Sequence, residues 1–138
     1  MSDLRETVRR IVEERGLCSC MNSTKWNELR TAMMQEMPFQ PPYIVKFLMD
    51  DTCYAEPGFR EDVCHTGNWY DAFAIEGEGF HAELAVEWVK VRPRYLKRRG
   101  ALLPPEVISA EAEFVAILQT YNIPYEESGG VYCIYGYR

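Results

Sequence analysis

Apolar residues recur at helical spacing in the first third of the chain. The first apolar stripe predicts a helix over residues 3–15 and consists of Leu4, Val8, Ile11 and Val12. The second stripe predicts a helix over about residues 24–36 and consists of Trp26, Leu29, Met33 and Met37. Asn22 or Ser23 is the expected cap of this second helix, and Pro38 follows its end.

The middle of the chain has the shorter patterns of strands. Residues 43–49 are nearly all apolar and rich in strand-forming types, which predicts a central strand. Phe73 and Ile75 alternate with small or polar residues, which predicts a second strand over 70–76. A third strand is predicted over 83–92, where the apolar phase shifts between Trp88 and Val89. That shift indicates a β-bulge or burial on both faces. Residues 93–100 are expected to leave the sheet as a basic connector.

The last third predicts a helix and a hairpin. Apolar spacing favours a helix over about 110–121 with Ser109 as its cap, and Gly129 and Gly130 favour a turn between two final strands. The predicted order is ααβββαββ, which indicates an α+β fold with a mainly antiparallel sheet. We expect one domain over residues 1–138, with 1–20 as a possible helical extension. Residues 50–69 have no clear period and are expected to form a long loop.

Three long strings in the sequence resemble a known group of proteins. They are MNSTKWNELRTAMMQEMPFQPPY, EWVKVRPRYLKRRGALLPPE and YNIPYEESGGVYCIYGYR. They resemble an uncharacterised family of small bacterial proteins over about residues 21–138. The resemblance implies no established activity, cofactor or site residue. Because Met21 resembles an internal start, we expect residues 1–20 to be dispensable for folding of the rest.

Composition and cysteine content indicate a cytoplasmic protein. The first ten residues lack the apolar stretch of a secretory signal, and no apolar run is long enough to span a membrane. The five cysteines are an odd number and are expected to be reduced and unlinked. They are Cys18, Cys20, Cys53, Cys64 and Cys133.

The net charge of −6 is unevenly distributed along the chain. Residues 50–87, which we name the acidic segment, hold ten acids and one base, Arg60, and therefore sum to −9. Residues 90–99 hold six bases and no acid, and therefore sum to +6. We expect some of these bases to pair with the acidic segment or to protect a strand edge.

Two kinds of chemistry are candidates in the loop. The weak metal candidates are Cys53, Cys64 and His65, with Asp50, Asp51 or His81 nearby. Their spacing matches no common ligand template, so no metal or cofactor is expected. A cysteine nucleophile is disfavoured because the surrounding acids oppose the thiolate. The many acids single out no catalytic carboxylate pair. A metal-dependent or carboxylate-using enzyme centred on residues 50–71 is therefore the alternative hypothesis.

The leading hypothesis is a small acidic protein-interaction domain, with an inhibitor or immunity-type protein as one form. Its expected contact surface is residues 50–71, because aromatic and charged side chains commonly anchor interfaces. The candidate binding residues are Asp50, Asp51, Glu61, Asp62, His65, Trp69 and Tyr70. The expected partner is another protein with a basic surface, and a homo-oligomer is compatible with the same surface. Nucleic-acid binding through residues 90–99 is a further alternative, disfavoured by the acidity of the whole chain.

Overall fold

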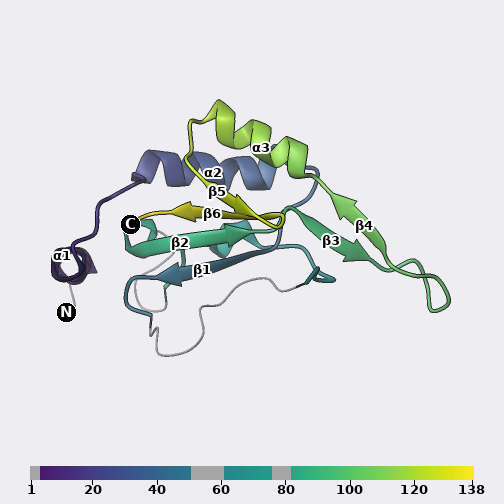
Figure 1. Ribbon diagram of the computed structural model, residues 1–138, viewed down its shortest axis with the longest axis horizontal. Coiled ribbons are helices and arrows are strands. Elements are labelled where there is room, and N and C mark those ends of the chain that lie inside the picture. Colours follow the sequence, from purple (N-terminus) through teal and green to yellow (C-terminus); the bar gives the residue numbers. More distant parts are fainter. Residues whose placement is uncertain (1–3, 51–60, 76–81) are drawn as a thin grey trace.

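Two helices and a four-stranded antiparallel sheet form the main body of the protein (Figure 1). The computed structural model describes residues 4–50, 61–75 and 82–138. Helices α2 (Ser23–Gln35) and α3 (Glu111–Thr120) cover one face of the sheet. The sheet has the order β1 (Tyr43–Phe47), β2 (Val86–Val91), β6 (Val131–Tyr135) and β5 (Glu126–Ser128). The predicted α+β fold is confirmed.

The second helix was well predicted because its local signals and its packing agree. The Asn22 side chain accepts a hydrogen bond of 2.8 Å from the Lys25 backbone nitrogen, which caps the helix as expected. Trp26, Leu29 and Met33 are buried against the sheet and against α3. The helix ends at Gln35, before the proline that cannot continue it.

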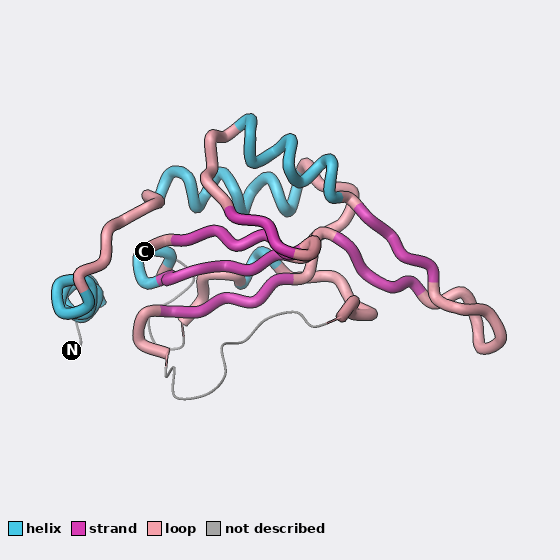
Figure 2. Tube along the Cα trace, viewed as in Figure 1, coloured by secondary structure: helices cyan, strands magenta, loops and turns pink. Residues whose placement is uncertain are grey.

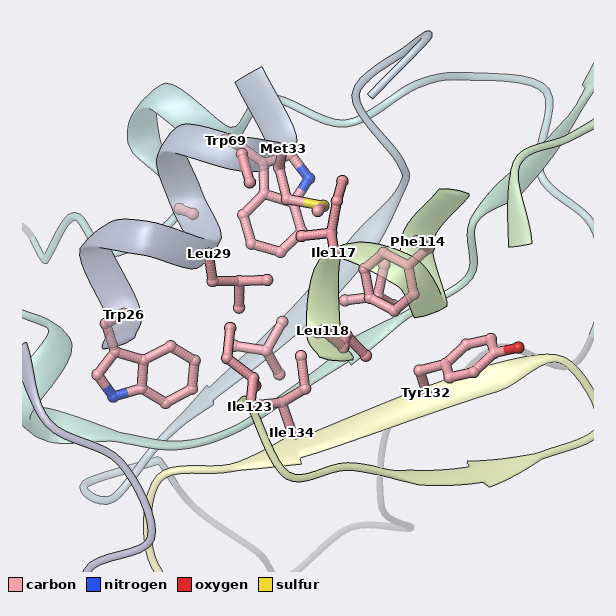
Figure 3. Packing of buried hydrophobic residues seen from close by; sticks show 14 of the residues in the cluster. Trp26, Leu29, Met33, Trp69, Phe114, Ile117, Leu118, Ile123, Tyr132 and Ile134 are labelled. Atoms are coloured by element: carbon pink, nitrogen blue, oxygen red, sulfur yellow. The ribbon is translucent and has the colours of Figure 1, made fainter. Parts of the chain in front are cut away.

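The core lies between the two helices and the sheet (Figure 3). Helix α3 contributes Phe114, Ile117 and Leu118, while β6 contributes Tyr132 and Ile134. The predicted helix at 110–121 is confirmed, but its expected cap is wrong. Ser109 is the last residue of a strand, and Ala110 occupies the cap position without a side-chain hydrogen bond.

The order of strands corrects one prediction and confirms another. Strand β1 stands at one end of the described sheet and is not central, because β2 and β6 occupy the middle. The register between β1 and β2 shifts at Glu87, since Lys46 faces Trp88 while Phe47 faces Val86. One extra residue in β2, Glu87, forms a β-bulge. The phase shift between Trp88 and Val89 lies in regular pairing and reflects burial on both faces, the other alternative that the sequence left open. The terminal hairpin is confirmed, with Gly129 and Gly130 at φ of 58° and 82°.

The predicted strand over residues 70–76 is wrong over 70–75, and residue 76 lies outside the described residues. Trp69–Asp71 form a short 3-10 helix, η1, and Phe73 lies in the turn that follows it. The Asn68 side chain accepts a hydrogen bond from the Tyr70 nitrogen and thereby starts this helix locally. Residues Glu83–Ala85 form a second 3-10 helix, η2, so the third predicted strand begins only at Val86.

The predicted basic connector is instead part of a second sheet. Strand β3 (Arg94–Lys97) pairs with β4 (Glu106–Ser109), a strand that the sequence did not indicate. The two strands and their turn, residues 94–109, project from the main body, and we name them the β-arm (Figures 1 and 2). Charge dominates the sequence of β3, and β4 has only four residues between two prolines and a helix, so neither has a clear period.

Helix α1 (Leu4–Arg15) lies beside one end of the sheet, near the C-terminus (Figure 1). Val8 is 5% exposed and packs with Leu48 and Ala85 in a small second cluster. After the helix, the Cys18 backbone exchanges two hydrogen bonds with that of Arg138, of 3.0 and 2.9 Å. No helix in residues 4–50, 61–75 and 82–138 has the length and apolarity needed to cross a membrane.

These contacts lead us to expect that residues 1–20 stabilise the fold, contrary to the expectation from the sequence. A chain that starts at Met21 loses the cover of Leu48 and Ala85 and the pairing of the C-terminal backbone. Since burial of one large apolar side chain contributes about 1.5–3 kcal/mol, we expect a loss of about 3 kcal/mol. Urea unfolding of both chains measures this loss. Equal stability of the two chains would restore the view of residues 1–20 as an independent extension.

Candidate functional site

Asp62 anchors the loop to the base of the β-arm. Its Oδ1 atom accepts hydrogen bonds of 2.7 Å from Nε of Arg92 and from Nε of Arg94. The side chain of Arg92 is 8% exposed and that of Asp62 is 17% exposed. Burial alone would raise the pKa of Asp62, but hydrogen bonds and charge from the two arginines lower it below its ordinary value. Asp62 is therefore engaged inside the protein.

Trp69 belongs to the core, which corrects its prediction as a surface contact. Its side chain is fully buried, and its indole Nε1 donates to the Pro41 carbonyl at 2.9 Å. The Tyr43 ring lies 4.6 Å from the Trp69 ring, measured between centroids. Gly67 lets the loop backbone pass close to Pro41, because a Cβ at this position would lie 2.3 Å from the Pro41 carbonyl oxygen. A large aromatic residue in a polar loop can either be buried in the core or contact a partner. The sequence alone does not distinguish these two roles.

The other described candidates in the loop lie at the surface. Asp50, Glu61, His65 and Tyr70 are exposed, and Tyr70 is 61% exposed. The Asp50 carboxylate accepts a hydrogen bond of 2.8 Å from the Phe47 nitrogen at the end of β1. These four residues are therefore exposed at the surface, whereas Asp62 is engaged in ion pairs and Trp69 is buried.

The predicted metal candidates fall partly outside the described residues. Asp51, Cys53 and His81 lie in the segments that the structure does not describe. Cys64 and His65 are exposed, and the His65 ring Nδ1 lies 3.1 Å from the Thr66 carbonyl oxygen. In the described parts of the chain, no three His, Cys, Asp or Glu side chains are placed to hold a metal ion. The cysteines described there, at positions 18, 20, 64 and 133, are not in disulfide bonds.

Glu87 forms a second partly buried ion cluster at the bulge of β2. Its Oε1 atom lies 2.6 Å from Nη1 of Arg15 and 2.8 Å from Nζ of Lys46. Burial alone would raise the pKa of Glu87, but hydrogen bonds from Arg15 and Lys46 and their charges lower it. This cluster joins α1, β1 and β2, and therefore has a structural role.

The bases of residues 90–99 do not form one stripe. Lys90 lies 4.5 Å from the centroid of the Trp88 ring, on the sheet. Arg92 and Arg94 bind Asp62, which confirms that some of these bases pair with the acidic segment. Only the last three bases of the segment are exposed: Lys97, Arg98 and Arg99.

The tip of the β-arm presents apolar side chains to solvent. Leu102 is 98% exposed, Leu103 is 58% exposed and Val107 on β4 is 50% exposed. Arg99 Nε donates to the Pro104 carbonyl at 3.0 Å, which holds the two sides of the turn together. The sequence analysis missed this tip. Its signal was a leucine pair between Gly100 and Pro104, since turn positions are normally polar.

The base of the β-arm is packed against the body. The Tyr95 ring meets the Phe39 ring edge to face, with centroids 4.9 Å apart. The Leu96 nitrogen donates to the Val63 carbonyl at 2.8 Å. Together with the Asp62 ion pairs, these contacts hold the arm at its root while its tip extends away from the body (Figure 2).

A polar hollow of about 520 Å³ lies between the start of α2 and the end of α3. It is lined by Asn22, Thr24, Lys25, Glu28, Thr120, Tyr121 and Asn122. Lys25 Nζ donates to the Asn122 carbonyl at 2.5 Å. The lysine thus satisfies a carbonyl just beyond the C-terminal end of α3, which is a structural use of its charge.

The fold and its surfaces define a two-layer α+β domain with a projecting β-arm. The chain belongs to the family of unknown function DUF6678, whose model matches residues 8–138. This confirms the resemblance to an uncharacterised family and extends it from Met21 back into α1. Neither the curated proteins nor the solved structures contain a match to the chain.

Proposed function

We propose that the protein is a cytoplasmic protein-interaction domain whose main contact element is the β-arm. The observation that supports this proposal is the near-complete exposure of Leu102 at the end of a projecting ribbon. Exposed apolar side chains gathered in one place favour a contact site, because their burial by a partner is favourable. An inhibitor or immunity-type protein is one form that such binding takes.

The chemistry of the arm favours an acidic protein surface with an apolar pocket as its partner. Lys97, Arg98 and Arg99 stand beside the leucine tip, so charge and apolar contact occur together. Duplex nucleic acid would contact the basic side chains of the arm but would offer no apolar surface on which to bury Leu102 and Leu103. Binding to nucleic acid depends on basic residues that neutralise phosphates, and three exposed basic residues supply little of that salt-dependent affinity.

The test is the replacement of Leu102 and Leu103 by aspartate in the full-length protein. Both residues are exposed, so we expect the fold to be retained and partner capture in the native cell to be lost. Affinity purification of the tagged wild type and of the variant, with identification of the retained proteins, measures this. Far-ultraviolet circular dichroism of both proteins checks the fold.

Met49→Asp is the matched control away from the arm, because Met49 is also an exposed large apolar residue. We expect this variant to keep the partner that the arm variant loses. Capture that is lost in Tyr70→Asp and kept in the leucine variant would transfer the contact surface to residues 50–71. Salt-sensitive binding of RNA or DNA by the wild type, lost when the arm arginines are replaced, would contradict the proposal of a protein partner.

A further inference from the structure

We infer that the β-arm binds a second copy of this chain, with its basic, apolar tip on the acidic surface of residues 61–71. This inference rests on the proposed function and names the partner. In a two-fold dimer each arm would lie on the other copy, so that one kind of contact is made twice. Four observations support it.

The first observation is the division of charge within the chain. The β-arm holds the bases Arg94, Lys97, Arg98 and Arg99 and the acid Glu106, so it sums to +3. Since the whole chain has a net charge of −6, the remainder sums to −9. A second copy therefore offers the arm a complementary charge, and contacts between opposite charges orient such an encounter.

The second observation concerns exposed apolar side chains. Among the described residues, the exposed large hydrophobic residues outside the β-arm are Met49 and Tyr70. Met49 is next to Asp50, and Tyr70 is next to Asp71, whose side chain is also exposed. Met49 and Asp50 follow the end of β1 that lies away from the β-arm. The surface of residues 61–71 has both properties that match the arm: the exposed acids Glu61 and Asp71 and the apolar area of Tyr70.

The third observation is that the two segments already bind each other within one chain. Asp62 holds Arg92 and Arg94 at 2.7 Å, and Leu96 bonds to the Val63 backbone. Acids of the loop and bases of the arm are thus matched in the folded protein. At the exposed end of the arm, Arg98 and Arg99 carry the same guanidinium groups as Arg92 and Arg94. Their described contacts include no acid from the loop.

The fourth observation is the direction of the arm. Its tip extends away from the sheet and both helices, beyond the body of its own chain (Figures 1 and 2). Its root is fixed by the Tyr95–Phe39 contact and by the Asp62 ion pairs. A rooted arm that reaches outward buries its tip on another molecule. The same geometry repeated by a two-fold axis closes a dimer.

The experiment is sedimentation velocity of the purified full-length protein over a range of concentrations at low and high salt. We expect a concentration-dependent dimer that weakens as salt rises, because the charge contacts are screened. Arg98→Glu with Arg99→Glu should raise the dimer dissociation constant at least about tenfold, a change equal to about 1.4 kcal/mol. Leu102→Asp with Leu103→Asp should do the same.

The matched control is Arg9→Glu with Arg10→Glu on α1. Both arginines are exposed, and the substitution changes the charge by the same amount. We expect this variant to dimerise like the wild type. If Arg9→Glu/Arg10→Glu weakened the dimer as much as Arg98→Glu/Arg99→Glu does, the effect would come from total charge. That result would overturn the assignment of the contact to the arm.

A charge exchange tests the receptor surface. Glu61→Lys with Asp71→Lys should also raise the dimer dissociation constant, and mixing this variant with Arg98→Glu/Arg99→Glu should restore a heterodimer. A wild type that stays monomeric at high concentration would overturn the second-copy inference, including the case in which the monomer binds anionic vesicles through its arm. If that monomer still captures another protein through Leu102 and Leu103, the proposed function stands and only the inference about its partner fails.

Discussion

Trp69→Ala is expected to lower the free energy of unfolding by about 3–5 kcal/mol, the usual cost of truncating a buried aromatic residue. The indole is fully buried, donates to the Pro41 carbonyl and packs on the Tyr43 ring. Its removal leaves a cavity under the loop and leaves Pro41 without that donor. Chemical unfolding monitored by circular dichroism measures the loss, since the method does not depend on the replaced fluorophore.

The adjacent residue supplies the control for this prediction. Tyr70 is 61% exposed, so Tyr70→Ala should change the unfolding free energy by no more than about 0.5 kcal/mol. The two neighbours therefore differ several-fold in their effect on stability. A stable Trp69→Ala protein that fails to bind a partner would instead return Trp69 to the contact surface predicted from the sequence.

The fold was predictable where local pattern and tertiary packing agree. In α2, the Asn22 cap, the apolar stripe and the following prolines all specify one helix, and the structure contains it. The terminal hairpin was equally accessible, because two glycines in the left-handed region define its turn. Over residues 70–76 the alternation of Phe73 and Ile75 misled, since Phe73 enters the core from the turn after η1 and not from a pleated strand.

The candidate site was less predictable because it depends on which charges meet in space. The sequence shows that residues 50–87 are acidic and that 90–99 are basic, but not that Asp62 binds two arginines from the second segment. The β-arm depends on pairing between strands of four residues each, which is too short for a reliable period. Only after that pairing is known does Leu102 become the end of a projecting element.

Asp62→Asn is expected to destabilise the protein by about 3 kcal/mol near neutral pH. The substitution leaves the nearly buried Arg92 without its counter-charge, and removal of one member of a buried pair costs about 3–5 kcal/mol. We expect the lower end of that range, because the side chain of Asp62 is 17% exposed and that of Arg94 is 31% exposed. Loosening of the arm root should accompany the loss, and faster amide exchange at the Leu96 nitrogen would report it.

The pH dependence of this effect follows from the lowered pKa of Asp62. A carboxyl group whose pKa is lower in the folded state stabilises the fold at pH values above its unfolded pKa, about 3.9 for aspartate. That contribution is lost as the pH falls through the lowered folded value. The difference between wild type and Asp62→Asn should therefore be largest near neutral pH and should narrow below about pH 4. Urea unfolding across this range measures it, with Glu61→Gln as the exposed neighbour that should change little. A difference that stays constant with pH would show that the ion pairs with Arg92 and Arg94 do not stabilise the fold.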